Sequence, residues 1–426
     1  MIARCFNPIV SRSFCQNQSL GSKVFRCRNA SPDGCPAGGS VYSHPTTIIH
    51  SARLSSGSLT QTDAWVRFDD DRVSARGTGD AWRTGLPPGA AVVDAADRAL
   101  VPGFIDMHCH GGGGAAADEG AEAIGTVLRA HRAHGTTRTV LSLVTAATDA
   151  LLGRLGSIAR ITAEDPGVLG AHLEGPFLDH DFRGAHDPSL LREADDATVD
   201  ALLEAAGGTL RQITIAPEHP GAASAITRFV DAGVAVAVGH SGTDYPTAME
   251  AFGRGASILT HAFNGMRGIH HRAPGPVVAA LRSDHVTLEM INDGVHVHPG
   301  VVGLAFASAR GRVALITDAM AAADYADGTY QLGTLEVVVS EGIARTVSTG
   351  SIAGSTLTQD AALRRAVLEC GVSFGDAVKA LTTVPAAAVG RAHDLGRLDV
   401  GFAADAVLLD SNFHVDAVWG AGSRLV

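Results

Sequence analysis

Lysine is nearly absent from this sequence of 426 residues, in which Lys23 and Lys379 are the only two. Arginine supplies almost all of the positive charge, and acidic side chains outnumber basic ones to give a formal net charge of -11. This balance argues against a nucleic-acid partner, because the arginines are scattered rather than gathered into a basic stripe. The gap between the two lysines also excludes a metal site that depends on a lysine ligand in the middle of the chain.

Long apolar runs are missing as well. From residue 46 onward the apolar stretches are short and interrupted by Gly, Asp, Arg or His, whereas a membrane helix needs about 20 apolar residues in succession. Only Cys109 and Cys370 lie beyond residue 35, so a disulfide framework is not expected in the folded part. We therefore expect a cytoplasmic protein that has neither a membrane nor a nucleic acid as its partner.

Residues 1–45 differ in composition from the rest of the chain. They hold four of the six cysteines and several arginines, and they lack the continuous apolar core of a secretory signal. Three interpretations stay open: a transit-like leader, a poorly ordered N-terminal extension, or non-native sequence caused by a start site placed too far upstream. We favour the last interpretation and assign the segment no function.

The remaining length suits one large domain with a small satellite, since 46% of the residues are hydrophobic and can bury a core of barrel size. Residues 46–100 alternate short apolar runs with Gly, Asp and Pro turns, and residues 396–426 repeat this pattern of small antiparallel strands. We predict that the two segments pair into one small β-sandwich domain, with the central domain at 101–395. The predicted strands include Thr47–Ile49, Ala64–Phe68, Arg72–Val73, Gly396–Leu398, Ala406–Leu409 and Val415–Val418.

The central segment has the pattern of an α/β protein with a (β/α)8 barrel of the TIM type. Eight strand-like apolar runs alternate with helical segments: Phe104–Met107, Thr139–Val144, Val168–Leu173, Gln212–Ile215, Val234–Val238, Ser257–Leu259, Val286–Ile291 and Val313–Ile316. Seven of the eight are followed at once by a charged or imidazole side chain. A barrel builds its active site at the carboxyl ends of its strands, whereas an open sheet would gather polar residues at one switch point. The pattern therefore favours the barrel.

Two histidines follow the first of these runs. His108 and His110 lie two residues apart, so they project from the same face of a strand and both could reach one metal ion. Taken alone, the pair is equally compatible with two incidental histidines at a strand end. The interpretation depends on what the other strands bring to the same place.

Four further strand ends carry the side chains of metal chemistry. Glu174 follows the third run, and His240 and His261 follow the fifth and sixth. One glutamate, two histidines and a water form a familiar arrangement for catalytic zinc. Asp318 follows the eighth run, and a carboxylate beside a metal-bound water can take its proton and later deliver one to a leaving amine. Asp318 is therefore the candidate general base and acid, with a helix N-cap as its structural alternative.

Longer motifs carry a resemblance to a known family. The segment Pro102–Gly111 is similar to the opening motif of the amidohydrolase superfamily. Other motifs resemble those of the N-acetylglucosamine-6-phosphate deacetylases in order and spacing: His172–Phe177, Gly184–Pro188, Gly239–Ser241, Thr260–Met266, Asp293–His296 and Thr317–Ala319. The resemblance extends over about residues 46–426 and is highly specific.

The resemblance implies a role for each matching residue. It implies that Glu174, His240 and His261 hold the catalytic metal and that Asp318 shuttles the proton. His186 would be catalytic as well, by helping to polarise the acetyl carbonyl. The implied substrate-binding residues are Ala185, His186, Asn264, Gly265, Arg272, Asp293, His296, Ile352, Ala353, Gly354 and Ser355. A guanidinium fork and glycine-rich backbone N–H groups suit a phosphate. A homodimer is also implied, because a neighbouring subunit contributes to the phosphate site in this family.

The implied reaction is hydrolysis of the acetamide of N-acetyl-D-glucosamine 6-phosphate to D-glucosamine 6-phosphate and acetate, in amino-sugar catabolism and cell-wall sugar recycling. The implied cofactor is a divalent metal, with Zn²⁺ favoured over Fe²⁺, Mn²⁺ or Co²⁺. Some members of the family lack the H-x-H pair and use one metal, whereas His108 and His110 could support a second ion bridged by Glu174. One or two ions, and acceptance of the galacto epimer or of other N-acyl groups, stay open.

Three alternatives are less compatible with these residues. A cyclic amidase of the dihydroorotase or hydantoinase type would bridge two metals with a carboxylated lysine, and the predicted strands hold none. A nucleobase deaminase would not need Asn264, Arg272 and His296 arranged for a phosphate. A catalytically inactive barrel used as a scaffold is expected to have lost some ligands, and here every one is present.

Overall fold

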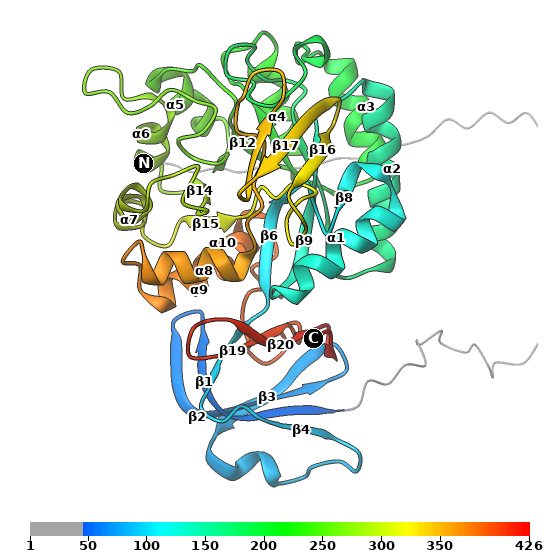
Figure 1. Ribbon diagram of the computed structural model, residues 1–426, viewed down its shortest axis with the longest axis vertical. Helices are drawn as coiled ribbons and strands as arrows, with labels where there is room; N and C mark the ends of the chain where they lie inside the picture. The colour runs from blue at the N-terminus through cyan, green and yellow to red at the C-terminus, as the bar shows by residue number, and fades with distance from the viewer. Residues whose placement is uncertain (1–45) are drawn as a thin grey trace, which may run out of the picture. The chain divides into compact units, whose positions relative to one another are not determined.

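Strands from the middle of the chain and strands from its two ends form two separate eight-stranded sheets (Figure 1). The computed structural model describes residues 46–426, so the interpretations of residues 1–45 lie outside the described residues. The central sheet is parallel throughout and has the strand order β15-β14-β13-β12-β11-β10-β9-β6. Its strands are β6 (Phe104–Cys109), β9 (Thr136–Val144), β10 (Val168–Glu174), β11 (Leu210–Ile215), β12 (Ala235–Val238), β13 (Ile258–Leu259), β14 (Thr287–Ile291) and β15 (Val313–Ile316). All eight predicted runs are strands, and the barrel prediction is confirmed.

The first and last strands of the central sheet meet at a seam. Cys109 and Ala319 form a parallel bridge there, and the backbone N–H of Asp318 donates to the carbonyl of His108 at 2.8 Å. The Thr317 hydroxyl donates to the Asp106 carboxylate at 2.6 Å across the same seam. These bonds close the ring and place the ends of β6 and β15 beside each other.

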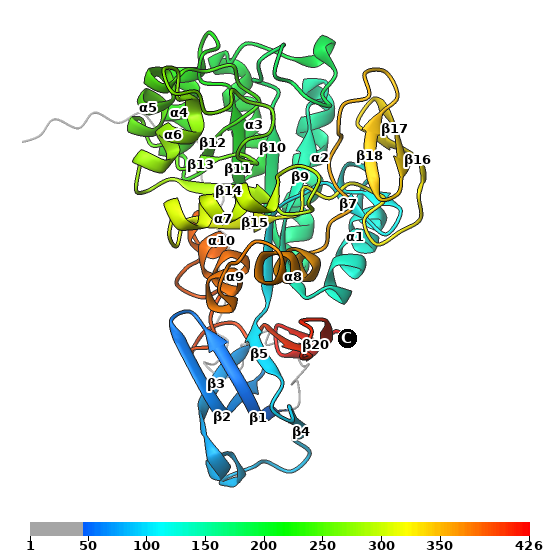
Figure 2. The ribbon, with the colours of Figure 1, turned by 60° about the vertical axis from the view of Figure 1, so that its left-hand side comes forward.

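Helices connect consecutive strands and cover the outside of the barrel (Figure 2). In α4 the buried positions Ala222, Ala225, Ile226 and Phe229 recur every three or four residues, so one face of the helix packs on the core. None of the helices among residues 46–426 is long and apolar enough to cross a membrane. The helices are α1 (Ala121–Ala133), α2 (Thr148–Glu164), α3 (Asp196–Ala206), α4 (Ala222–Asp231), α5 (Tyr245–Gly253), α6 (Gly275–Arg282), α7 (Pro299–Ser308), α8 (Gln359–Leu368), α9 (Phe374–Leu381) and α10 (Thr383–Ala388), with 3-10 turns at Gly79–Arg83, Ala117–Glu119 and Pro188–Leu190.

The two ends of the chain share the second sheet, as the sequence predicts. Its strands are β1 (Thr47–Ser56), β2 (Leu59–Asp69), β3 (Arg72–Thr78), β4 (Ala91–Asp94), β5 (Ala99–Pro102), β19 (Ala406–Leu409), β20 (Val415–Gly420) and β21 (Ser423–Arg424). The antiparallel pair of β5 with β19 joins the N-terminal strands to the C-terminal ones. Phe68, Leu100 and Trp419 are buried in their common core. Domain boundaries after residues 100 and 395 stay a prediction.

The strand predicted at Gly396–Leu398 is wrong. Gly396 has a left-handed backbone with φ of 80°, and the N–H of Leu398 donates to the Ser56 hydroxyl at 2.8 Å instead of to a strand carbonyl. Leu398 is fully buried all the same. The apolar pattern therefore indicated the burial of Leu398 correctly, but the segment is a turn and not a strand.

Two small sheets were not predicted. The strands β7 (Gly111–Gly112) and β8 (Ala115–Ala116) form a short ribbon after β6. The strands β16 (Gly328–Leu332), β17 (Leu335–Ser340) and β18 (Ile343–Thr346) form an antiparallel insert after β15, and Figure 2 shows it separate from the strands of the barrel. We call these three strands the β16–β18 insert.

The tip of the β16–β18 insert is fixed against the barrel. Gly333 has φ of 57°, and a Cβ atom at this position would lie 2.8 Å from Cγ2 of Val144 at the end of β9. Only glycine permits so close an approach with this backbone conformation. Next to it, the Thr334 hydroxyl donates to the Asp187 carboxylate at 2.9 Å. The tip therefore contacts both the end of β9 and the loop that follows β10.

Candidate active site

The polar residues that follow the strands converge at one end of the barrel, with Glu174 at their centre. Its Oε1 lies 3.0 Å from Nε2 of His240 and 3.1 Å from Nε2 of His261. Its Oε2 lies 3.2 Å from Nε2 of His110, and Oε1 lies 3.4 Å from Nε2 of His108. One carboxylate from β10 thus faces imidazoles from three other strand ends.

The rings of His240 and His261 turn bare nitrogen lone pairs toward this carboxylate. Nδ1 of His240 lies 2.9 Å from the carbonyl of Phe182, and Nδ1 of His261 lies 3.2 Å from the carbonyl of Asn264. Because a carbonyl only accepts, each Nδ1 carries the proton in the neutral ring and each Nε2 is an acceptor. When both rings are neutral, these two Nε2 atoms, 3.0 Å apart, and the Glu174 carboxylate are three acceptors with no proton between them. A cation at this point would resolve their repulsion.

A second group of ligand atoms lies on the other side of Glu174. The Nε2 atoms of His108 and His110 are 3.1 Å apart, and Oδ1 of Asp318 lies 3.5 Å and 3.3 Å from them, respectively. Nδ1 of His108 donates to the buried carboxylate of Glu289 at 3.1 Å, which leaves its Nε2 as an acceptor too. Within residues 46–426 the groups His108, His110, Glu174, Asp318 and Glu174, His240, His261 each could hold one metal ion. Glu174 belongs to both groups.

The electrostatics of the site favour positive charge at its centre. Burial by itself would raise the pKa of Glu174, but the surrounding imidazoles, led by that of His108, hold it well below its usual range. Burial would also raise the pKa of Asp318, and His108 and His110 lower it to about 2 instead. Burial would lower the pKa of His240, yet Glu174 raises it. Both carboxylates are therefore charged at neutral pH.

His186 behaves differently from the other histidines of the site. Burial lowers its pKa to about 4, so the ring is neutral at pH 7. Its Nδ1 accepts from the N–H of Thr145 at 3.4 Å, which places the proton on Nε2. That Nε2 lies 3.4 Å from Oε2 of Glu174 at the edge of the cavity. His186 is therefore equipped to donate a hydrogen bond to a group bound beside Glu174.

Three of the side chains at the centre stand on strained backbone. His240, His261 and Asp318 have φ of 45°, 23° and 49°, in the left-handed region that non-glycine residues rarely occupy. Such conformations cost about 1–3 kcal/mol each and persist where the surrounding structure imposes them, commonly at functional sites. The strain lies at the strand ends where the side chains leave the barrel and turn inward.

A cavity of about 200 Å³ opens above these residues and holds most of the predicted substrate-binding positions. Those that line it are Ala185, His186, Asn264, Gly265, His296, Ile352 and Gly354, together with His110, Glu174, His240, His261 and Asp318. Asp293 lies behind His296 and accepts from its Nδ1 at 2.7 Å. Ala353 and Ser355 are buried beneath the lining, where Ser355 donates to the carbonyl of Thr317 at 2.6 Å.

Arg272 does not lie with the others. It is exposed in the segment between β13 and α6, and its side chain does not line the cavity of its own chain. Ile269, in the same exposed segment, is an apolar residue that is 50% exposed. Within one chain the cavity therefore has His296 and Asn264, but not the predicted arginine, on this side.

Comparison with known proteins identifies the family of this chain. The sequence profile of the amidohydrolase family matches residues 99–425. The chain belongs to the amidohydrolase family.

Amidohydrolases with similar sequences act on phosphorylated amino sugars. The chain is 41% identical over 327 residues to an N-acetylgalactosamine-6-phosphate deacetylase from Escherichia coli O157:H7, covering 76% of this chain and 86% of the relative. It is 36% identical over 380 residues to an N-acetylglucosamine-6-phosphate deacetylase from Vibrio furnissii, covering 88% and 93%. A structure of N-acetyl-D-glucosamine-6-phosphate deacetylase from Mycobacterium smegmatis, an aspartate-to-alanine mutant in complex with N-acetyl-D-glucosamine-6-phosphate, is similar with a TM-score of 0.84 and 39% identity, covering 90% of this chain and all of that one.

Two residues at the candidate site of this amidohydrolase were missed in the sequence. Glu289 lies in the middle of β14 and is fully buried, where it accepts from His108, from the backbone N–H of His261 at 3.2 Å and from Gln212 at 2.7 Å. It fixes the tautomer of one candidate ligand, as carboxylates often do behind metal-binding histidines. A charged residue inside an apolar strand was the available signal. The other is Leu332 of the β16–β18 insert, which lines the cavity.

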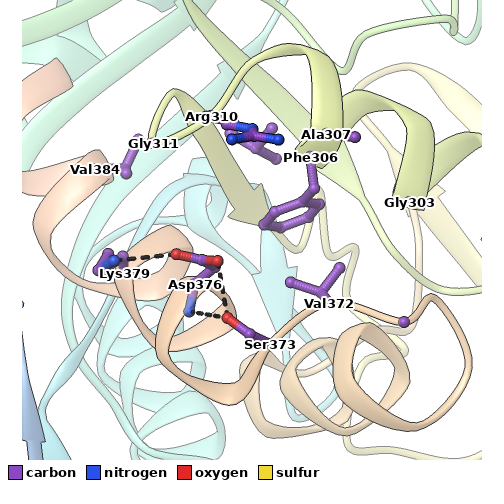
Figure 3. A pocket seen from close by; sticks show the side chains of 12 residues that line it. Gly303, Phe306, Ala307, Arg310, Gly311, Val372, Ser373, Asp376, Lys379 and Val384 are labelled. Atoms are coloured by element: carbon purple, nitrogen blue, oxygen red, sulfur yellow. Dashed lines mark hydrogen bonds and ion pairs between the residues drawn. The ribbon is translucent and has the colours of Figure 1, made fainter. Parts of the chain in front are cut away.

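A second cavity of about 340 Å³ lies between α7 and the start of α9 and contains none of the predicted site residues (Figure 3). Its polar side chains mostly bond one another. Lys379 donates to Asp376 at 3.0 Å, and the Ser373 hydroxyl donates to the same carboxylate at 2.8 Å. The larger cavity therefore lies between helices, and the smaller cavity is the one lined by the candidate metal ligands.

Proposed function

We propose that this amidohydrolase removes the acetyl group of N-acetyl-D-glucosamine 6-phosphate, giving D-glucosamine 6-phosphate and acetate, in amino-sugar catabolism and cell-wall sugar recycling. The observation that carries the proposal is the placement of Glu174, Asp318 and the imidazole ligands in one cavity with Asn264 and His296. The first set suits amide hydrolysis, and the second offers hydrogen bonds to a phosphate. The relatives named above support this substrate class. The proposal includes a cytoplasmic location, where phosphorylated sugars are metabolised.

The proposed cofactor is Zn²⁺, held by Glu174, His240 and His261, with His108, His110 and Asp318 available for a second ion. Imidazole and carboxylate donors suit zinc, and the three unprotonated acceptors around Glu174 fit a cation. When bound, a divalent ion at this point polarises the acetyl carbonyl and lowers the pKa of an attacking water. Fe²⁺, Mn²⁺ and Co²⁺ accept the same donors and are the alternatives.

The chain's own residues would manage the protons. Asp318 is ionised, so it can accept the proton of the attacking water as the new C–O bond forms. His186 donates from Nε2 to the acetyl oxygen and stabilises the negative charge that develops there. Asp318 then delivers its proton to the sugar nitrogen as the C–N bond breaks. The immediate products are acetic acid and the free amine, with Asp318 again ionised, and transfer of the acid's proton to the amine gives acetate and the ammonium form of the sugar.

The phosphate would lie on the side of the cavity formed by the ends of β13 and β14. Asn264 and Gly265 follow β13, and His296 follows β14. Burial would lower the pKa of His296, but Asp293 raises it, which favours the charged imidazolium that a phosphate prefers. We propose that Arg272 completes this subsite in a neighbouring copy of the chain, since it lies exposed and away from its own cavity. This proposal requires a homodimer.

Replacing His296 by glutamine tests the phosphate side. We expect kcat/KM for the phosphorylated substrate to fall by about 10- to 100-fold, because a charge-assisted hydrogen bond is lost. The slow hydrolysis of unphosphorylated N-acetylglucosamine should change less than 3-fold, and metal content should stay constant. Equal losses on both sugars would show that His296 acts elsewhere. His285→Gln is the matched control, because His285 bonds the carbonyls of Phe252 and Ala256 away from the cavity.

Acetate release by the metal-loaded protein is the direct test of the proposed function. N-acetyl-D-glucosamine 6-phosphate should be hydrolysed, removal of metal with a chelator should abolish turnover, and Zn²⁺ should restore it. No release by protein with confirmed metal content would refute the proposal. The same assay with the galacto epimer examines a second candidate substrate, which the 41% identical relative from Escherichia coli O157:H7 favours. A higher kcat/KM for that epimer would reassign the preferred sugar without changing the reaction.

A further inference from the structure

One wall of the active-site cavity is apolar and has no role in the chemistry described so far. It is formed by Val144, at the end of β9, and Leu332, at the tip of the β16–β18 insert, and Ala185 packs against the apolar cluster to which both belong. Val144 is 6% exposed and Leu332 is 8% exposed, so these side chains show only a small surface, and that surface faces the cavity. Ala185 precedes His186, which places this wall beside the donor proposed for the acetyl oxygen.

The order of strands around the barrel sets the position of this wall. From β9 to β13 the ring passes β10, β11 and β12 in one direction, and β6, β15 and β14 in the other. The end of β9 is therefore diametrically opposite the end of β13, which carries Asn264 and Gly265. The apolar wall and the proposed phosphate side face each other across the cavity, with Glu174 and the histidines between them.

The substrate has a matching arrangement of its ends. In a pyranose ring C2 and C5 lie across from each other, so the acylamino group on C2 and the phosphate-bearing C6 on C5 point in opposite directions. With the phosphate at β13 and β14 and the carbonyl at Glu174 and His186, the remainder of the acyl chain points at the end of β9. This step rests on the proposed function.

We propose that Val144 and Leu332 form an acyl pocket that selects the acetyl group over longer N-acyl groups. The wall is held firmly enough to discriminate between acyl groups of different length. Gly333 brings the tip of the insert into contact with Val144, and Thr334 ties it to Asp187 in the loop that carries His186. Leu332 is thus held from two sides, and a longer acyl chain would have to displace a fixed side chain. Each methylene that does not fit a hydrophobic pocket changes kcat/KM by about 10- to 200-fold.

The test compares N-acetyl, N-propanoyl and N-butanoyl glucosamine 6-phosphate as substrates of the metal-loaded enzyme. For the wild type, kcat/KM should fall steeply with acyl length. Leu332→Ala should raise the ratio of N-butanoyl to N-acetyl kcat/KM by at least about 10-fold, and Val144→Ala should shift it in the same direction. Leu332→Phe should lower kcat/KM even for the acetyl substrate. The inhibition constant of inorganic phosphate as a competing ligand should not change in these variants, because they leave the phosphate side of the cavity unaltered.

Val338→Ala is the matched control, because Val338 lies on β17 of the same insert but is 42% exposed. It should leave the ratio unchanged. If Leu332→Ala loses activity through disorder of the insert, Leu332→Val and Val144→Ala keep the test open. An unchanged ratio in every variant that still releases acetate would overturn the acyl pocket and leave the proposed function intact. No acetate release by the wild type would refute the proposed function itself.

Discussion

Replacing Asp318 by asparagine is expected to lower kcat by about 10²- to 10⁴-fold, the range over which a positioned general base and acid contributes. The substitution keeps the shape of the side chain and removes its ability to accept a proton. Glu174, His240 and His261 are unaltered, so a metal ion held by them should remain. Steady-state acetate release and metal content measured on the same sample would check both parts of this prediction.

The control for this variant is Asp231→Asn, which changes an exposed aspartate at the end of α4 and should leave turnover unchanged. KM should change much less than kcat in Asp318→Asn, because the proton transfer belongs to the transition state. Activity close to that of the wild type would remove Asp318 from the mechanism. A loss of metal in parallel with activity would instead make Asp318 chiefly a ligand.

Replacing Glu174 by glutamine is expected to abolish activity and to release bound metal. Glu174 contributes to both groups of candidate ligands at the cavity, so the change removes a negative charge from both of these ion positions at once. It also leaves five imidazoles facing a neutral amide. Metal-to-protein ratios after gel filtration should fall to a small fraction of the wild-type value, whichever number of ions the wild type holds.

The matched control is Glu204→Gln on the exposed face of α3, which should retain both metal and turnover. If Glu174→Gln kept its full metal content, the shared carboxylate would not be a ligand. A wild type with two ions and a His110→Gln variant with one would assign the second position to the β6 side. The wild-type metal-to-protein ratio therefore decides the metal count that the sequence left open, and His110→Gln locates the second ion.

The sequence predicted the centre of the site because its information is local. Glu174 directly follows an apolar run, and His240, His261 and Asp318 each follow one after a single intervening residue; all of these runs are parallel strands of one ring. The rule that barrel strands end at a common face then brings residues together that are far apart in the chain. The absence of lysine from these strands likewise excluded a metal site bridged by a carboxylated lysine.

Other features depend on contacts that no local pattern carries. Glu289 meets His108 across 181 residues, and only the register of the barrel makes the two neighbours. The β16–β18 insert follows the last strand, where a helix is expected in this fold. Gly333 and Gly342 lie at its turns, but no pattern in the sequence indicated that the insert contacts Val144. Arg272 was placed by resemblance alone, and no local pattern indicated that it lies exposed and outside the cavity of its own chain.

The seam between β6 and β15 has a consequence for folding. Of the residues proposed for a second ion, His108 and His110 come from the first strand of the ring and Asp318 from the end of the last, so this second position becomes complete only when the two edges of the sheet join. An ion that binds there binds the closed ring and not the open chain, and it should stabilise closure in proportion to its affinity. Loops of more than 200 residues are costly to close by chain entropy, although the cost grows slowly with length. Metal supplied during refolding should therefore hold the two edges of the sheet together and speed the recovery of native protein.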